Sequence, residues 1–271
     1  MGKIWPALDV GAGAAGDADL ALAAADDYSP TAAEERDGTF RIFFDSHENR
    51  DRAAAALSSQ FTIARVEVDD EDWARRSQSD LAPITVDRIV VHPALPARPA
   101  SPALIDLVIP PSMGFGTGRH STTRLCLAAL QKFDLHEKCV LDVGTGSGLL
   151  AIAAVKLGAS RAIGTDSDPD AIHAATENLE FNRVTNVELV VSDLMRDPLP
   201  MADVVIANLT GALLVRAASR LVAAVNPGGV LIVSGVLASE RDDIRRGFAN
   251  QRFVEDVQED EWLAFTMSSE C

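Results

Sequence analysis

The sequence has 271 residues, of which 47% are hydrophobic, and it carries 40 acidic against 24 basic residues. This length accommodates one catalytic domain with a small additional module, and the hydrophobic content suffices for a sizeable core. The net charge of −16 disfavours nucleic acid as a partner, because an acidic surface repels phosphates. It suits a basic protein partner, although the same charge is also explained by solubility alone.

The chain contains three cysteines, Cys126, Cys139 and Cys271. An odd and sparse set disfavours a disulfide framework and favours a reducing compartment, and no pair has metal-ligand spacing. No apolar run approaches the roughly 18 residues of a membrane span, and the N-terminus lacks the features of a secretory signal. We therefore expect a cytoplasmic protein with no bound metal and no membrane partner. The sequence does not determine the oligomeric state, for which a monomer is the expectation.

The first part of the chain is predicted to form a small α+β module, residues 1–68, in which short strands alternate with Ala-rich helices. The strands are expected at 4–10, 39–44 and 61–68, and the helices at 18–25 and 51–57. An acidic run, Asp69–Asp72, and a Pro-rich stretch follow. Residues 69–103 are therefore predicted to be a linker with some extended structure.

The rest of the chain, residues 104–271, is predicted to be an α/β domain. Strands are expected at 139–143, 161–165, 187–191, 203–207, 230–234, 253–257 and 262–267. Helices are expected at 122–131, from the first strand through 157, at 169–181, from the fourth strand through 225, and near 239–249. This alternation indicates a doubly wound, mostly parallel seven-stranded sheet with helices on both faces, closed by an antiparallel pair.

A Gly-rich turn follows the first strand of this domain, in the segment Asp142-Val-Gly-Thr-Gly-Ser-Gly148. Glycines at Gly144 and Gly146 allow a tight turn and a close approach of the backbone to a ligand. Ligands of doubly wound sheets bind at the carboxyl ends of the strands, where this turn lies. The spacing is GxGxG and not the dinucleotide GxGxxG. An ordinary strand–helix turn is the alternative reading of the motif taken alone.

Two further strands end in carboxylates. Asp166 lies 22 positions after Gly144, a distance at which an acid can accept hydrogen bonds from ribose hydroxyls. Asp168 precedes Pro169 and is predicted to be the N-cap of the next helix. Asp193 ends the third strand and is a candidate contact for the adenine amino group, with a turn-capping role as the alternative.

A second Gly-rich segment, Gly11–Gly16, matches GxGxxG literally. It lies in the small module and leads directly into Asp17 and Asp19, whose carboxylates would repel a pyrophosphate. We interpret it as a loop.

A third motif, Phe115-Gly-Thr-Gly-Arg-His-Ser-Thr-Thr123, precedes the helix at 122–131. From here on the sequence resembles the ribosomal protein L11 methyltransferase family, whose pattern reads FGTG-x-H-x-TT, then D-x-G-x-GSG, D-x-DP and AN-[IL]. All four occur in order, the last as Ala207-Asn208-Leu209. The resemblance covers residues 105–265 closely and includes Asp70–Trp73. The chain departs from the family after Asn208, where Leu-Thr-Gly stands in place of Ile-Leu-Ala, and in residues 74–90.

The resemblance implies S-adenosyl-L-methionine as cofactor and places Thr123, Gly144, Asp166 and Asn208 in its site. Gly146, Asp193, Phe115 and Thr117 complete the predicted cofactor-binding set. Phe115 and its flanking glycines are expected to form a lid. The resemblance also implies a substrate, the amino groups of a basic ribosomal protein, recognised by residues 1–68.

Methyl transfer from a sulfonium needs alignment, desolvation and a nucleophile with a free lone pair. Freeing a Lys amine at pH 7 costs about 4–5 kcal/mol, and an apolar pocket lowers this cost. The side-chain oxygen of Asn208 is predicted to orient the amine. His120 is predicted to be a possible proton acceptor, with a loop hydrogen bond as the alternative.

Two other functions stay open from sequence. One is methylation of a nucleic acid or small molecule on the same fold. The segment Asn208-Leu-Thr-Gly211 counts against it, because nucleic-acid amino methyltransferases usually carry Asn-Pro-Pro-aromatic there. The other is a binding protein that keeps the cofactor fold without activity.

Overall fold

The computed structural model describes residues 4–11, 17–36, 39–69, 82–96, 101, 103–110 and 119–268. The chain divides into two compact units. The smaller unit contains the chain up to Leu81, and the larger unit contains Ala82–Pro110 and the chain from Gly116 onwards. Among the described helices, none is long and apolar enough to cross a membrane.

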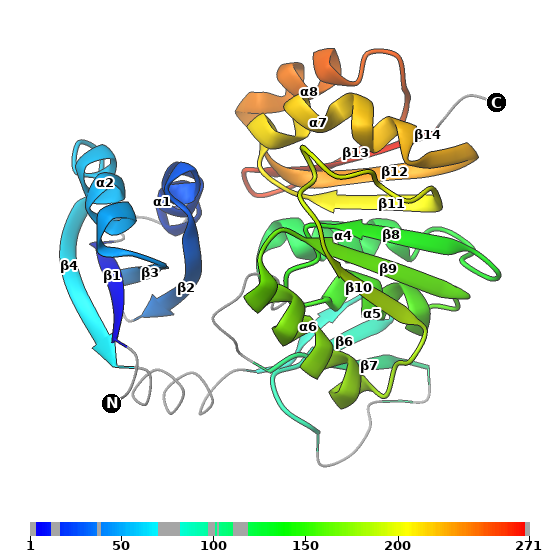
Figure 1. Ribbon diagram of the computed structural model, residues 1–271, viewed down its shortest axis with the longest axis horizontal. Helices are drawn as coiled ribbons and strands as arrows, with labels where there is room; N and C mark the ends of the chain where they lie inside the picture. Colours follow the sequence, from blue (N-terminus) through cyan, green and yellow to red (C-terminus); the bar gives the residue numbers. More distant parts are fainter. Residues whose placement is uncertain are drawn as a thin grey trace. The chain divides into compact units, whose positions relative to one another are not determined.

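The described part of the smaller unit has a four-stranded antiparallel sheet in the order β2-β3-β1-β4 (Figure 1). Its elements are β1 (Ile4–Gly11), α1 (Asp17–Ala25), β2 (Pro30–Arg36), β3 (Thr39–Phe44), α2 (His47–Leu57) and β4 (Thr62–Asp69). Both helices pack their apolar side chains onto the sheet, in a core that contains Leu8, Ile42, Phe44 and Leu57. The predicted strands and helices of this module are confirmed. Of the second Gly-rich segment, Gly11 ends β1, and residues 12–16 lie outside the described residues.

Strand β2 was not predicted. Its sequence, Pro30-Thr-Ala-Ala-Glu-Glu-Arg36, is rich in Ala and Glu, which have low β propensity. It lies at one edge of the sheet, where proline is tolerated because its missing N–H is not needed for a ladder bond. Pairing with β3 therefore outweighs the local preference.

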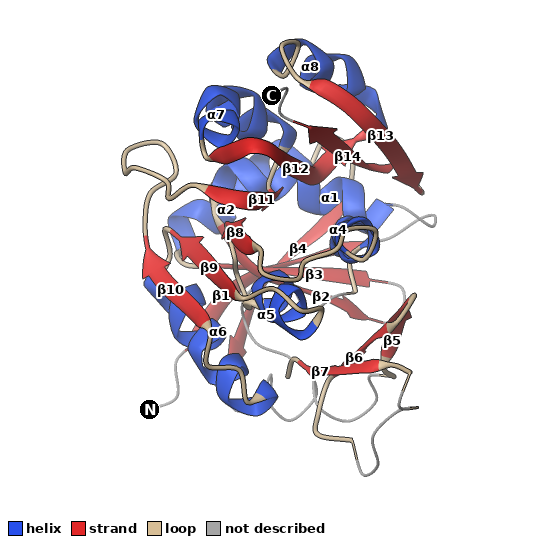
Figure 2. Cartoon of the chain, turned by 90° about the vertical axis from the view of Figure 1, so that its right-hand side faces the viewer, coloured by secondary structure: helices blue, strands red, loops and turns tan. Residues whose placement is uncertain are grey.

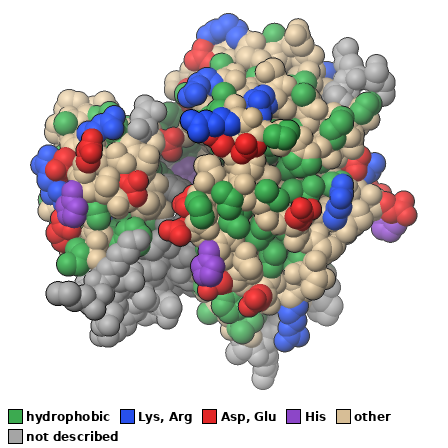
Figure 3. Space-filling model, in the orientation of Figure 1, with side chains coloured by type: hydrophobic (Ala, Val, Ile, Leu, Met, Phe, Trp, Pro, Cys, Tyr) green, Lys and Arg blue, Asp and Glu red, His purple; other side chains and the backbone are tan. Residues whose placement is uncertain are grey.

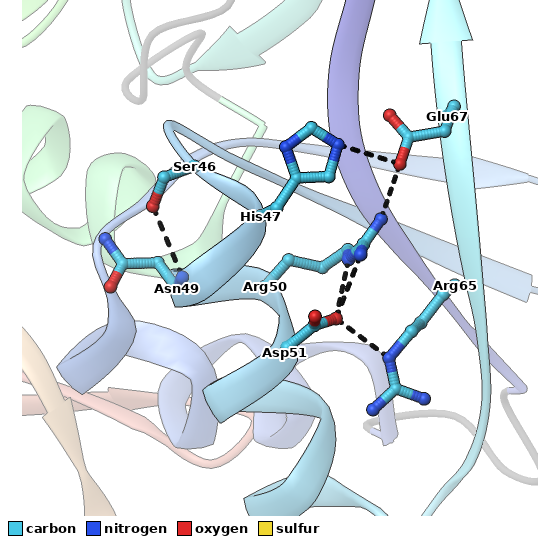
Figure 4. A network of polar contacts seen from close by, with 7 residues as sticks. All are labelled: Ser46, His47, Asn49, Arg50, Asp51, Arg65 and Glu67. Atoms are coloured by element: carbon cyan, nitrogen blue, oxygen red, sulfur yellow. Dashed lines mark hydrogen bonds and ion pairs between the residues drawn. The ribbon is translucent and has the colours of Figure 1, made fainter.

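A network of charged side chains joins α2 to β4 within the smaller unit (Figure 4). Arg50 contacts both Glu67, at 2.7 Å, and Asp51, at 2.9 Å. Arg65 reaches Asp51 at 2.9 Å, and His47 reaches Glu67 at 3.0 Å. The Arg65 and Arg50 guanidinium groups lower the pKa of Asp51. These charges satisfy one another and fix the helix on the sheet.

In the described part of the larger unit, a seven-stranded sheet has the order β10-β9-β8-β11-β12-β14-β13 (Figures 1 and 2). Its strands are β8 (Cys139–Val143), β9 (Arg161–Asp166), β10 (Val187–Val191), β11 (Ala202–Asn208), β12 (Val225–Leu237), β13 (Arg252–Glu259) and β14 (Trp262–Ser268). The first five strands run parallel, and β14 pairs antiparallel with both β12 and β13. The predicted fold class is confirmed.

Helices cover both faces of this sheet. They are α4 (Ser121–Leu130), α5 (Leu149–Lys156), α6 (Pro169–Asn182), α7 (Gly211–Ala223) and α8 (Arg241–Gly247). One core joins the side chains of α4 and α5 to the sheet, and a second core joins those of α7 and α8 to its other face. The carboxyl ends of the five parallel strands consequently meet at one edge, which is the edge where ligands of such sheets bind.

Three short strands form a separate sheet in the order β5-β6-β7. They are β5 (Ile84–Val86), β6 (Ile89–His92) and β7 (Ile105–Val108). Two of them fall in the stretch predicted to be a linker with some extended structure, and their buried side chains belong to the core of α4 and α5. The Asn182 side chain accepts a hydrogen bond from the Val108 N–H at 2.8 Å and donates to its carbonyl at 2.7 Å. These strands thus pack as part of the larger unit, while residues 70–81 of the stretch lie outside the described residues and the domain boundaries stay predictions.

Candidate functional site

The Gly-rich turn joins the carboxyl end of β8 to the start of α5. Gly144, Gly146 and Gly148 have φ values of 72°, 51° and 78°, a region that residues with a side chain rarely adopt. The backbone N–H groups of Gly144 and Thr145 both donate to the Thr165 carbonyl, at 2.8 and 2.9 Å. The turn is thereby bonded to the end of β9, which brings the first two predicted motifs together.

Asp166 ends β9 and holds the same turn through its carboxylate. Oδ2 accepts from the Gly146 N–H at 2.9 Å, and Oδ1 accepts from the Asp168 N–H at 3.0 Å. A carboxylate offers about four acceptor positions, so these two bonds leave acceptor capacity for a ligand hydroxyl. Asp168 accepts from the Asp170 N–H at 2.9 Å as the N-cap of α6, as predicted.

Asp142 lies beneath the turn and is 1% exposed. Burial raises the pKa of its carboxyl from 3.8 to about 6, against the lowering effect of hydrogen bonds from Thr145 Oγ1, at 2.7 Å, and the Ala151 N–H, at 3.2 Å. Its Oδ1 atom has no hydrogen-bond partner in the described part of the chain. From the sequence, Asp142 is only the first residue of the glycine motif, with no predicted role; in the structure it is a buried, partly unsatisfied acceptor at the candidate site.

Asn208 ends β11 beside the N-terminal turn of α4. Its Nδ2 atom donates to Thr123 Oγ1 at 3.3 Å, which joins two of the residues that the resemblance placed in the site. This bond leaves the Asn208 side-chain oxygen to accept from another donor.

Leu209, the next residue, packs between Gly144 and Gly235, two glycines that are distant from it in the sequence. A Cβ atom on Gly144 would lie 2.5 Å from Leu209 Cδ2, and one on Gly235 would lie 2.1 Å from the Leu209 carbonyl oxygen. Gly235 has a φ of 88° and sits where the pairing of β12 with β14 shifts register between Ser234 and Val236. Sequence reasoning missed Gly235, although a single glycine inside a strand pattern is a signal for a bulge.

His120 is the N-cap residue of α4. Its Nδ1 atom accepts from the Thr122 N–H at 3.3 Å and lies 2.8 Å from Thr122 Oγ1. The ring packs edge-to-face on Trp262, with centroids 4.7 Å apart. These contacts give His120 a capping role at the start of the helix that carries Thr123, and its role as a proton acceptor stays a prediction.

Asp193 follows β10 and organises its own turn. Oδ1 accepts from the Met195 N–H at 2.8 Å, and the Asp193 N–H donates to Asp197 Oδ2 at 2.8 Å. This is the capping alternative considered from sequence, and the adenine contact stays a prediction. Phe115 and Thr117, with the expected lid, lie outside the described residues. Among those described, no three His, Cys, Asp or Glu side chains come together as metal ligands.

The strand order of the larger unit, its antiparallel last strand, the glycine turn after β8 and the acid that ends β9 together define a Rossmann-like methyltransferase domain. The family model described as "Ribosomal protein L11 methyltransferase (PrmA)" matches residues 17–270. The chain therefore belongs to the ribosomal protein L11 methyltransferase family. The match begins at residue 17 and so takes in most of the smaller unit.

Individual relatives agree with this assignment. The chain is 44% identical to a ribosomal protein L11 methyltransferase of Geobacter metallireducens over 234 residues, which cover 84% of this chain and 75% of the relative. It is 45% identical to that of Geobacter sulfurreducens over 206 residues, 74% of this chain and 67% of the relative. A solved ribosomal protein L11 methylase from Lactobacillus delbrueckii subsp. bulgaricus superposes with a TM-score of 0.64 at 26% identity, covering 70% of this chain and 99% of that one.

Proposed function

We propose that the chain transfers methyl groups from S-adenosyl-L-methionine to amino groups of ribosomal protein L11, on lysine side chains or the N-terminus. The observation that carries the proposal is the meeting of the Gly144–Gly148 turn, Asp166 and Asn208 at the carboxyl edge of one parallel sheet. The names of the relatives, which are 36–45% identical, supply the substrate.

The residues at this edge fit the cofactor. The bare backbone of Gly144 and Gly146 admits a ligand at close range, and the spare acceptor capacity of Asp166 suits the ribose hydroxyls. The Oδ1 atom of Asp142 has no hydrogen-bond donor among the described residues. A cationic amino group bound near the turn would supply one. When bound, S-adenosyl-L-methionine supplies an electrophilic methyl group on a sulfonium.

The chain's own contribution to the reaction is to hold and orient the acceptor amine, whose ammonium proton passes to solvent. Because Asn208 Nδ2 is bonded to Thr123, its oxygen is free to accept a hydrogen bond from the amine and aim the nitrogen lone pair. Partial burial of Asn208 and Leu209 disfavours the ammonium form, since desolvation lowers amine pKa values. Under this proposal no covalent protein intermediate is needed.

The smaller unit would recognise the protein substrate. The chain's net charge of −16 attracts a basic protein and speeds its encounter at low salt. In the view of Figure 3, basic side chains of the larger unit gather over α7 and α8. Arg241 and Arg245 both pair with Asp256, and Arg246 pairs with Asp243. Because carboxylates pair with these three arginines of α8, the part of the gathering over α8 gives little support to a nucleic acid substrate.

The test is incubation of the purified chain with S-adenosyl-L-methionine and unmodified ribosomal protein L11, followed by peptide mass spectrometry. Methyl groups on lysine side chains or on the N-terminal amine are the expected result. Their absence under conditions in which the chain binds the cofactor would overturn the proposed substrate. Methylation elsewhere, on a hydroxyl or carboxyl group, would overturn the proposed amine chemistry.

A further inference from the structure

The N-terminus of α7 directly follows the segment that carries Asn208. The helix begins at Gly211, and its N-cap residue Thr210 makes no side-chain capping bond within the described structure. The first N–H groups of a helix need acceptors and carry a partial positive charge. A threonine at this position usually supplies the acceptor, but Thr210 does not do so here.

The carboxylate of Glu240 lies at this helix start. A Cβ atom on Gly211 would be 2.7 Å from Glu240 Cδ, Oε1 and Oε2, so the carboxylate rests on the bare Cα of Gly211. Glu240 is half-buried and comes from the short 3₁₀ helix that follows β12. Its Oε2 atom accepts from the Leu237 N–H at 2.8 Å, which holds the side chain against the end of β12.

The end of β12 also contacts Leu209, two residues before Gly211. The Leu209 N–H donates to the Ser234 carbonyl at 3.0 Å, and the Leu209 carbonyl fills the space that a side chain on Gly235 would take. The segment Asn208–Gly211 is therefore fixed to β12 at two points before Gly211 and by Glu240 at Gly211. A shift of about 1 Å in a reacting group is enough to reduce a rate about 100-fold.

We infer that Glu240 is a positioning residue for methyl transfer: its carboxylate packs on the bare Cα of Gly211 at the start of α7 and fixes the segment that carries Asn208. This inference rests on the proposed function for its kinetic consequence. It also explains why glycine stands at position 211, because any side chain there displaces the carboxylate. Glu240 makes no hydrogen bond with the glycine turn or Thr123 in the described structure, so its larger effect falls on the transfer step, and its effect on cofactor affinity, through Asn208, is smaller.

The test compares E240A, E240Q, G211A and E240A/G211A with the wild type, and with D242A as a control that removes an exposed carboxylate from the first turn of α8. We expect E240A and G211A each to lower kcat for ribosomal protein L11 about tenfold. KM and the Kd for S-adenosyl-L-methionine stay within about twofold, as expected when only a positioning contact is lost. E240Q keeps most of kcat, because its amide oxygen still accepts from Leu237. The double variant is no slower than either single one, because both changes remove the same contact.

Thermal unfolding tests the contact without a substrate. Replacing glycine by alanine in a helix is stabilising when the site has room. The site at Gly211 has room in the E240A variant and not in the wild type. Adding G211A should therefore raise the unfolding midpoint of E240A by a few degrees more than it raises that of the wild type. Equal shifts in both backgrounds would overturn the contact.

The role of Glu240 is overturned if E240A matches D242A in kcat, or if E240Q loses as much as E240A with a raised KM, which would make Glu240 a charge that binds substrate. A wild-type chain that does not methylate ribosomal protein L11 overturns the proposed function and the kinetic role together. Normal wild-type activity with an unaffected E240A variant overturns this inference alone.

Discussion

The two units of the chain use their polar groups differently. In the smaller unit, the charged residues of α2 and β4 pair with one another, as Arg50 does with Glu67 and Asp51. In the larger unit, polar groups at the carboxyl edge of the sheet keep spare capacity: Asp142 Oδ1 lacks a described partner, and Asn208 uses only its amide nitrogen in a described hydrogen bond.

This difference indicates that the paired charges of the smaller unit contribute to its stability, whereas the polar groups at the carboxyl edge of the larger unit are available for chemistry. A paired charge network closes on itself and fixes a helix to a sheet, whereas buried groups with unused capacity are a cost that a ligand can offset. Under the proposed function, cofactor binding and methyl transfer belong to the larger unit, and recognition of the protein substrate belongs to the smaller one. Four predictions test that division.

The largest effect is expected for Gly144→Val. A β-branched residue at a φ of 72° is strained, and its side chain meets Leu209 and occupies the space of the ligand. Calorimetric titration should detect no binding of S-adenosyl-L-methionine, while circular dichroism shows a folded chain. A folded variant with wild-type affinity would remove the glycine turn from the site.

Deletion of residues 1–68 should have the next largest effect, on one activity only. The larger unit has its own cores, so cofactor affinity should stay nearly unchanged, and methylation of ribosomal protein L11 should fall at least about tenfold through loss of local substrate concentration. The activity of the intact chain should also decline as salt rises. A truncated chain as efficient as the full one would give the smaller unit a different role.

A smaller loss is expected for Asp166→Ala. The variant loses charge-assisted hydrogen bonds to ribose and to the Gly146 N–H, a cost of about 1.5–3 kcal/mol. Calorimetry should show a Kd roughly 10- to 150-fold higher. Asp166→Asn, which keeps one acceptor oxygen, is the matched control and should lose less. An unchanged Kd in the alanine variant would show that Asp166, the acid that ends β9, does not contact the cofactor.

Asp142→Asn should change the pH dependence of stability. The folded pKa of about 6 lies above the ordinary aspartate value of 3.8, so the folded state binds more protons between these values and loses stability as pH rises through 6. The whole effect is about 3 kcal/mol, of which roughly 1 kcal/mol falls between pH 5 and 7. Urea unfolding should show this decline in the wild type relative to the variant. Parallel pH profiles would mean that Asp142 is not the buried titrating group.

Sequence reasoning reached those parts of the structure in which local pattern and tertiary context agree. The strands 139–143 and 187–191 match β8 and β10 residue for residue, because apolar runs between turn residues are also what a buried parallel sheet requires. The turn at Gly144 and the acid at Asp166 follow strands directly, so their meeting at one edge was predictable.

The missed features depend on contacts between distant segments. Strand β2 forms because it pairs with β3, although its residues have low β propensity. The strands within 84–92 lie in a Pro-rich stretch, whose composition indicates a linker. Gly235 and Glu240 act on Leu209 and Gly211, about 30 positions earlier in the chain, and no local pattern relates them. The capping role of His120 likewise became visible only with the geometry of α4.

The most direct test of the central claim is the mass of ribosomal protein L11 isolated from cells that lack this chain. The account predicts that its methyl groups are absent there and return when the wild-type chain is supplied. They do not return with Asn208→Ala, which removes the predicted hydrogen-bond acceptor for the amine while keeping the glycine turn. Fully methylated ribosomal protein L11 in the cells that lack the chain, or full restoration by the Asn208→Ala variant, would contradict it.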